Sequence, residues 1–135
     1  MTVNITPYLM MGGNAREAIQ YYQKSLGAEV MMLINYDDMP DPSTEHLHGL
    51  VAHAKLQIEE STIMISDSPS TTPIQQGNQV TISITTNDVE KSKRFFEALK
   101  DEGKVKMPFQ QQSFSPGYGS LTDKFGVTFL FDTEI

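Results

Sequence analysis

The sequence contains no cysteine. This absence excludes disulfides, thiolate metal ligands and thiol nucleophiles, so a metal ion would have to be held by imidazole and oxygen groups. No stretch approaches the roughly 20 apolar residues that a membrane-spanning helix needs, and no basic leader precedes an apolar run. We therefore expect a cytoplasmic protein without a membrane partner.

Positive charge is also scarce. The chain has 10 Lys and Arg against 17 Asp and Glu, for a formal net charge of -7. Such a chain repels a phosphate backbone, and only the short cluster Lys91, Lys93 and Arg94 gathers basic side chains. We expect no nucleic-acid partner. The eight Met, seven Phe and five Tyr suit an irregular core or a soft small-molecule pocket.

An internal repeat organises the 135 residues, which have room for one domain or for two half-domains sharing a core. Residues 6–26 match residues 80–100 position by position. Each copy opens with an alternating apolar stretch that predicts a strand with one apolar face. The matched apolar positions are Tyr8 and Met10 in the first copy, and Val80, Ile82 and Ile84 in the second.

A helix follows each of these strands. Asn14, with Glu17 three residues later, predicts a capping box at the first helix, and Asp88 predicts a cap for the second. Gly27 and Gly103 are expected to end the helices in the left-handed conformation. The apolar stripes are Ala15, Ala18, Ile19, Tyr22 and Leu26 in one helix, and Val89, Ser92, Phe96 and Leu99 in the other.

Strand patterns fill the rest of each copy. The expected strands are 29–36, 48–58 and 62–66, with a tight turn at Glu59 to Ser61, and then 104–110, 114–122 and 126–132. Each copy is thus a β-α-β-β-β module, in residues 1–66 and 80–135, and the fold class is α+β. Residues 67–79 predict a linker, and residues 37–45 an exposed acidic loop.

Two such modules in one short chain resemble the vicinal oxygen chelate superfamily, which has the glyoxalase, bleomycin-resistance and dihydroxybiphenyl dioxygenase fold. The segments PYLMMGGNAREAIQYYQKSLGAEV, VAHAKLQIEESTIMISDSP and KMPFQQQSFSPGYGSLTDKFGVTFLF are similar to its PhnB-like branch. Members of that branch sometimes carry a demethylubiquinone methyltransferase name. The resemblance implies a single domain over residues 1–135, with two modules whose mixed sheets curl into cups, working as a homodimer.

The superfamily holds a divalent metal on the first and last strands of both modules. The corresponding positions here are Pro7 or Tyr8, Thr81, Met64 to Ser66, and Leu130, none of them a His or a carboxylate. We therefore predict no metal and no other cofactor. The alternative is a metal site that uses His53 with Glu or Gln residues from shifted positions.

Three histidines are candidates for chemistry. His53 lies inside the apolar run from Val51 to Ala54 and is the candidate catalytic residue, although a hydrogen-bonded structural imidazole is the commoner arrangement. His46 and His48 are expected on one face of a strand after Glu45. They predict a solvated strand entry or, less often, an adventitious metal site.

The resemblance implies a substrate pocket, and the alternative for its aromatic members is ordinary core packing. Gly117 and Gly119 could let a ligand approach the backbone closely. The predicted pocket residues are Tyr8, Met10, His53, Phe109, Gln111, Phe114, Tyr118 and Phe129.

Glycines occur in two further turns. Gly12 and Gly13 before Asn14 predict a tight strand-to-helix turn, because a dinucleotide site needs a third glycine and a downstream acid in a parallel unit. We therefore expect no methyl-donor cradle. Asp123 to Gly126 predicts an architectural turn before the last strand.

Three functions are compatible with these features. The first is binding of a small polar-aromatic metabolite, or its metal-independent conversion, in a cupped pocket. The second is a metal-dependent lyase, isomerase or dioxygenase. The third is non-catalytic sequestration of a cationic drug, with which the charge of -7 agrees. The sequence leaves open whether the protein is an enzyme, and it does not name the ligand.

Overall fold

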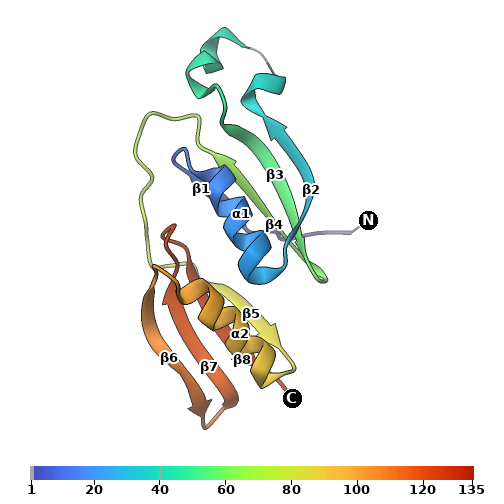
Figure 1. Cartoon of the computed structure of the whole chain (residues 1–135), viewed down its shortest axis with the longest axis vertical. Helices are drawn as coiled ribbons and strands as arrows, with labels where there is room; N and C mark the ends of the chain where they lie inside the picture. Colours follow the sequence, from blue (N-terminus) through green and yellow to red (C-terminus); the bar gives the residue numbers. More distant parts are fainter. Residues whose placement is uncertain (1, 40) are drawn as a thin grey trace. The chain divides into compact units, whose positions relative to one another are not determined.

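A computed structural model describes residues 2–39 and 41–135 (Figure 1). The chain divides into two compact units, Met1–Gln75 and Gln76–Ile135. Each unit is a four-stranded mixed sheet with one α-helix against it. The predicted α+β class is confirmed.

The first unit has its sheet in the order β1-β4-β3-β2. Strand β1 runs parallel to β4, and the other neighbours are antiparallel. Its elements are β1 (Tyr8–Met11), α1 (Ala15–Leu26), β2 (Glu29–Asn35), the 3-10 helices η1 (Tyr36–Asp38) and η2 (Pro42–Leu47), β3 (Val51–Ile58) and β4 (Ser61–Asp67).

The second unit repeats this plan in the order β5-β8-β7-β6, with β5 parallel to β8. Its elements are β5 (Ile82–Thr86), α2 (Val89–Lys100), β6 (Lys104–Gln112), β7 (Ser115–Thr122) and β8 (Thr128–Thr133). Both units therefore have the β-α-β-β-β order that the sequence predicts.

Each helix buries one stripe against its own sheet. All five predicted positions on α1 are buried, and so are three of the four on α2, Ser92, Phe96 and Leu99, while Val89 is half-buried. In the first unit the stripe faces buried strand residues such as Leu56 and Ile65. Removing this apolar surface from water is the main source of stability in each unit.

The first strands of the two units are out of step by one residue. Ile82 and Ile84 pair with Phe129 and Phe131, which are buried on the helix side of the second sheet. In β1, however, the buried residue is Met11, while Tyr8 and Met10 are 44% and 43% exposed. The sequence match placed these two pairs of residues on equivalent faces, and that prediction is wrong. Because side chains alternate along a strand, a shift of one residue moves the whole set to the opposite face.

The start of α1 is capped from a distance. Asn14 makes no side-chain cap hydrogen bond, so the predicted capping box is wrong. The buried carboxylate of Asp67 takes its place. Its Oδ1 accepts from the backbone N–H groups of Gly13 and Ala15, both at 2.9 Å, and its Oδ2 accepts from Val51 N at 3.0 Å. One side chain thus joins the ends of β1 and β4 to the starts of α1 and β3. Asp67, the first residue of the predicted linker, is therefore part of β4.

The other helix ends agree in part with prediction. Asp88 accepts from Glu90 N and Lys91 N, as expected for a cap, and Gly27 has the left-handed φ of 67°. After α2 it is Glu102, with φ 59°, that adopts this conformation. Gly103 is required for space, since a Cβ there would lie 2.6 Å from the carbonyl oxygen of Thr122. The expected left-handed Gly103 is wrong.

Two strand entries also differ from prediction. Strand β3 begins at Val51, so His46 lies in η2 and His48 at its end, and neither shares a strand face. The acidic segment before β3 forms η1 and η2 where a plain loop was expected; its Pro40 lies outside the described residues. In the second unit Val80 precedes β5 and is 80% exposed.

The Asp67 arrangement predicts unequal effects of two substitutions at the same helix start. Asp67→Ala leaves three N–H groups without their acceptor, and we expect it to lower the free energy of unfolding by about 3–5 kcal/mol. Asn14→Ala should change it by less than about 0.5 kcal/mol, because no cap bond is lost. Urea denaturation followed by circular dichroism measures both. Equal effects of the two substitutions would contradict the cap assignment.

Candidate functional site

The face of the first sheet that turns away from α1 carries the candidate site. Strand register places its residues in two rows across the sheet. One row is Tyr8, Met64, Lys55 and Met32, and the next is Met10 and Ser66 on β1 and β4, continued by His53 and Ile34 on β3 and β2. We call these eight residues the open face. None of the eight lies on the side of the sheet that α1 covers.

A tyrosine and a histidine meet at the centre of the open face. Tyr8 Oη lies 3.0 Å from His53 Nδ1, and the two rings pack edge to face with centroids 5.5 Å apart. His53 is half-buried and Tyr8 is partly exposed. The pair therefore offers two polar groups, each able to donate or accept a hydrogen bond, at a surface that a ligand can reach.

Methionines surround the pair. Ser66 Oγ donates to Met10 Sδ at 3.2 Å, which holds the thioether beside the Tyr8–His53 pair, called the dyad below. Met10 and Met32 are 43% and 40% exposed, and Met64 is half-buried between Tyr8 and Lys55. Flexible, polarizable thioethers suit contact with an aromatic or otherwise apolar ligand.

Sequence reasoning missed Tyr36. Its hydroxyl donates to the carbonyl oxygen of Asp67 at 2.9 Å. Burial, the negative charge of Asp67 and the nearby phenol of Tyr8 raise the pKa of Tyr36 above its ordinary value. Tyr36 thus brings a second phenol close to Tyr8. No strand alternation places it there, because Tyr36 follows the end of β2 and begins η1.

The remaining predicted pocket residues lie in the second unit, and only some of them are outside its core. Phe109 packs against Phe96 of α2 with ring centroids 5.6 Å apart, and Phe129 is 2% exposed beside Phe131. Both belong to the helix-side core, the alternative that the sequence left open, and the site proposed below leaves them out. Tyr118 and Phe114 contact each other edge to face at 4.8 Å, and Gln111 is exposed on β6.

Gly117 and Gly119 serve this core packing. A Cβ on Gly117 would lie 2.7 Å from the Phe109 ring, and one on Gly119 would lie 2.9 Å from the Phe109 Cα. The close approach that these glycines permit is therefore that of Phe109. A ligand is not needed to explain them.

The donor atoms on the open face do not fit the divalent metal of the superfamily. The face offers one imidazole, from His53, whose Nδ1 already faces Tyr8, and hydroxyl and thioether groups. Within residues 2–39 and 41–135, no three His, Asp or Glu side chains form a group that could hold a metal ion. Hard divalent cations need several carboxylate or imidazole ligands.

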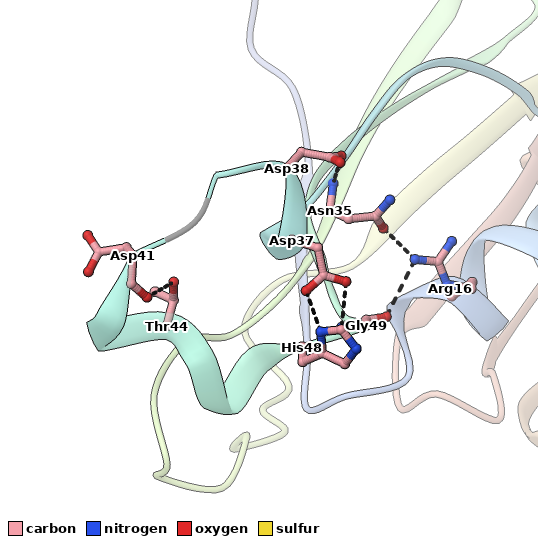
Figure 2. Close-up of polar contacts among 8 residues, drawn as sticks. All are labelled: Arg16, Asn35, Asp37, Asp38, Asp41, Thr44, His48 and Gly49. Atoms are coloured by element: carbon pink, nitrogen blue, oxygen red, sulfur yellow. Dashed lines mark hydrogen bonds and ion pairs between the residues drawn. The ribbon is translucent and has the colours of Figure 1, made fainter.

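The acidic segment before β3 forms a pocket of its own. The pocket measures about 570 Å³ and is lined by Tyr36, Asp37, Asp41, Pro42, Thr44, Glu45 and His48. In Figure 2, Asp37 reaches His48, whose Nδ1 is 2.8 Å away, and also accepts from Gly49 N at 3.1 Å. Arg16 of α1 reaches Asn35 and the Gly49 carbonyl. Bonds from Ser43 lower the pKa of Asp41.

The turn of Gly12 and Gly13 binds a carboxylate of the chain itself. Gly13 has a φ of 113°, which favours glycine, and its N–H points to Asp67 together with that of Ala15. The helix start that would receive a phosphate already holds a carboxylate of the chain itself. The predicted tight turn before α1 is confirmed.

The Tyr8–His53 bond predicts a spectroscopic effect of one substitution. Tyr8→Phe removes the partner of Nδ1, so the ring ¹⁵N shifts of His53 should change. The free energy of unfolding should fall by no more than about 1 kcal/mol, because the bond is partly exposed. Long-range ¹H–¹⁵N spectra of the imidazoles measure this, and His46 in the same spectra is the control. Unchanged His53 shifts would contradict the assignment.

Comparison with known proteins identifies the family of this chain. Residues 3–131 match the family model described as 3-demethylubiquinone-9 3-methyltransferase. Protein YjdN of Escherichia coli (strain K12) is 34% identical, over 95% of this chain and 93% of its own length. The crystal structure of protein PA1353 from Pseudomonas aeruginosa gives a TM-score of 0.89 at 29% identity, covering 98% of both chains.

A second solved structure gives the branch. It is described as a putative 3-demethylubiquinone-9 3-methyltransferase, PhnB protein, from Bacillus cereus, with a TM-score of 0.83 and 26% identity over 98% of this chain and 100% of that one. No helix in the described part of the chain is long and apolar enough to cross a membrane. The chain belongs to the family described as 3-demethylubiquinone-9 3-methyltransferase, in its PhnB-like branch.

Proposed function

We propose that the protein binds a small polar-aromatic metabolite on the open face of its first sheet, without an obligatory metal. The observation that carries the proposal is the Tyr8–His53 pair, held at 3.0 Å among partly exposed methionines on a face that α1 does not cover. Ligand sites commonly combine an apolar surface with a few convergent polar groups.

The dyad determines how a ligand is recognised. If Tyr8 donates to Nδ1, the proton of the neutral imidazole lies on Nε2, which then donates to the ligand. If Nδ1 donates to Tyr8, Nε2 presents a lone pair and can accept a hydrogen bond or a proton. A ligand hydroxyl suits either tautomer because it can donate or accept, whereas a carbonyl oxygen suits only the tautomer in which Nε2–H donates. The same exchange allows metal-independent proton transfer, so the site serves binding or catalysis.

The other two predicted functions have less support. A metal-dependent lyase, isomerase or dioxygenase needs a ligand set that the open face does not offer. Sequestration of a cationic drug would use the acidic pocket beside η2, which Asp37, Asp41 and Glu45 line. That pocket is a separate feature from the Tyr8–His53 pair, and the sequestration reading stays a prediction.

Methionine methyl groups report binding directly. In protein labelled with ¹³C at the methionine methyls, a ligand from a panel of phenols, catechols and aromatic keto acids should shift the signals of Met10, Met32 and Met64. It should also raise the melting temperature by mass action. Both effects should persist in EDTA.

Met31 and Met39 supply the internal control. They are 58% and 49% exposed, but the register shift in β2 leaves Met31 without a partner on β3 and outside both rows of the open face, and Met39 follows η1. Their signals should stay in place. Shifts confined to these two residues, or binding that EDTA abolishes, would overturn the proposal.

We also propose that the protein works as a homodimer, as the family resemblance implies. Strand β2 is an edge of the first sheet, and Val30, Met31 and Met32 are 38%, 58% and 40% exposed along it. An apolar strand edge usually needs a cover. Light scattering should give twice the 15.1 kDa chain mass, and Met31→Lys should lower it. A monomer at micromolar concentration would contradict the proposal.

A further inference from the structure

The open face differs in charge from the rest of the molecule. The chain as a whole carries a formal net charge of -7, yet its open face holds one lysine, Lys55, and no carboxylate. Glu29 comes next along the face, where it pairs with Gln57 at the far end of the sheet. No ion pair joins Lys55 to Glu29 or to any other described residue.

Lys55 lies on the same strand and the same face as His53. It lies between Met64 and Met32 in its row, and it is two residues from His53 on β3. Residues two apart on a strand project from the same face about 7 Å apart. The ammonium group and the His53 ring can therefore engage the two ends of one ligand, while the methionines contact what lies between them.

We propose that the ligand class of this site is an aromatic carboxylate with a hydroxyl or keto oxygen at the far end of the ring, a class that para-hydroxybenzoate represents. This inference rests on the function proposed above and specifies its ligand. Lys55 binds the carboxylate, His53 binds the opposite oxygen with Tyr8 holding its ring, and Met32, Met64 and Met10 pack on the aromatic plane. A carboxylate is attracted to the positive charge of Lys55, whereas a neutral phenol is not.

Three probes separate these contributions. Para-hydroxybenzoate has both ends, benzoate lacks the hydroxyl, and para-hydroxybenzamide lacks the charge. In the methionine-methyl experiment, we expect para-hydroxybenzoate to bind more tightly than either of the others. Added salt should weaken the binding of the two anions and leave that of the amide unchanged, because salt screens exposed charges.

Two substitutions test the two ends, each with a matched control. Lys55→Gln should weaken para-hydroxybenzoate binding about fivefold and leave para-hydroxybenzamide within about twofold, while Lys24→Gln on exposed α1 should change neither. His53→Gln should reduce the affinity for para-hydroxybenzoate to that for benzoate without altering benzoate binding, and His46→Gln should have no effect. Unchanged melting temperatures establish that the variants are folded.

The outcomes distinguish this inference from the proposed function. If all three probes bind the open face equally and Lys55→Gln has no effect, the carboxylate assignment is overturned and the proposed function stands. If none of the three shifts Met10, Met32 or Met64, the ligand class is wrong, and the wider panel of phenols, catechols and keto acids then decides the proposed function. Shifts at Met31 or Met39 alone would overturn both.

Discussion

The carboxylate of Asp67 is the contact on which the first unit depends. A buried charge is costly unless its oxygens find hydrogen-bond donors. Here two oxygens accept three backbone N–H groups, from the turn before α1 and from the start of β3. The helix start gains an anion where its dipole favours one. The carbonyl of the same residue accepts from Tyr36, so one amino acid fixes five segments of chain.

This contact also positions the proposed site. Val51, which donates to Asp67, begins β3, and His53 follows two residues later on the open face. Met11 pairs with Asp67 at the end of β1, three residues after Tyr8. The end of the strand that carries Tyr8, the start of the strand that carries His53, and Tyr36 in η1 are therefore all tied to one residue, Asp67. Its loss would disturb the dyad geometry as well as the fold.

The second unit solves the same problem with hydroxyl groups. Thr133 occupies the matching end of β8, and its Oγ1 lies 3.0 Å from Ser92 Oγ on α2 and 2.9 Å from the Gly117 carbonyl. Ser92 also contacts Thr86, and Asp88 caps the helix locally. Two copies of one topology have thus kept their strand order while their helix-to-strand contacts diverged.

The spacing of apolar residues predicts the helices and strands well, because it reflects which side chains are buried. The stripes of α1 and α2, the hairpin turn before β4 and the β-α-β-β-β order all follow from apolar spacing. It failed where a distant residue decides the structure. Nothing near Asn14 reveals that Asp67 will replace it as the cap. Nor does the local pattern reveal that η1 and η2 follow β2, so that β3 begins only at Val51.

The site shows the same limit most clearly. The turn between β1 and α1 has three residues where that between β5 and α2 has two, so Tyr8 and Met10, which align in sequence with the helix-side residues Ile82 and Ile84, face outward. A residue match alone cannot detect this, since both strands alternate and only the register with β4 or β8 determines which face is covered. The shift places Tyr8 and Met10 beside His53 on the open face, whereas Ile82 and Ile84, their matches in sequence, pair with the helix-side residues Phe129 and Phe131 of the second sheet.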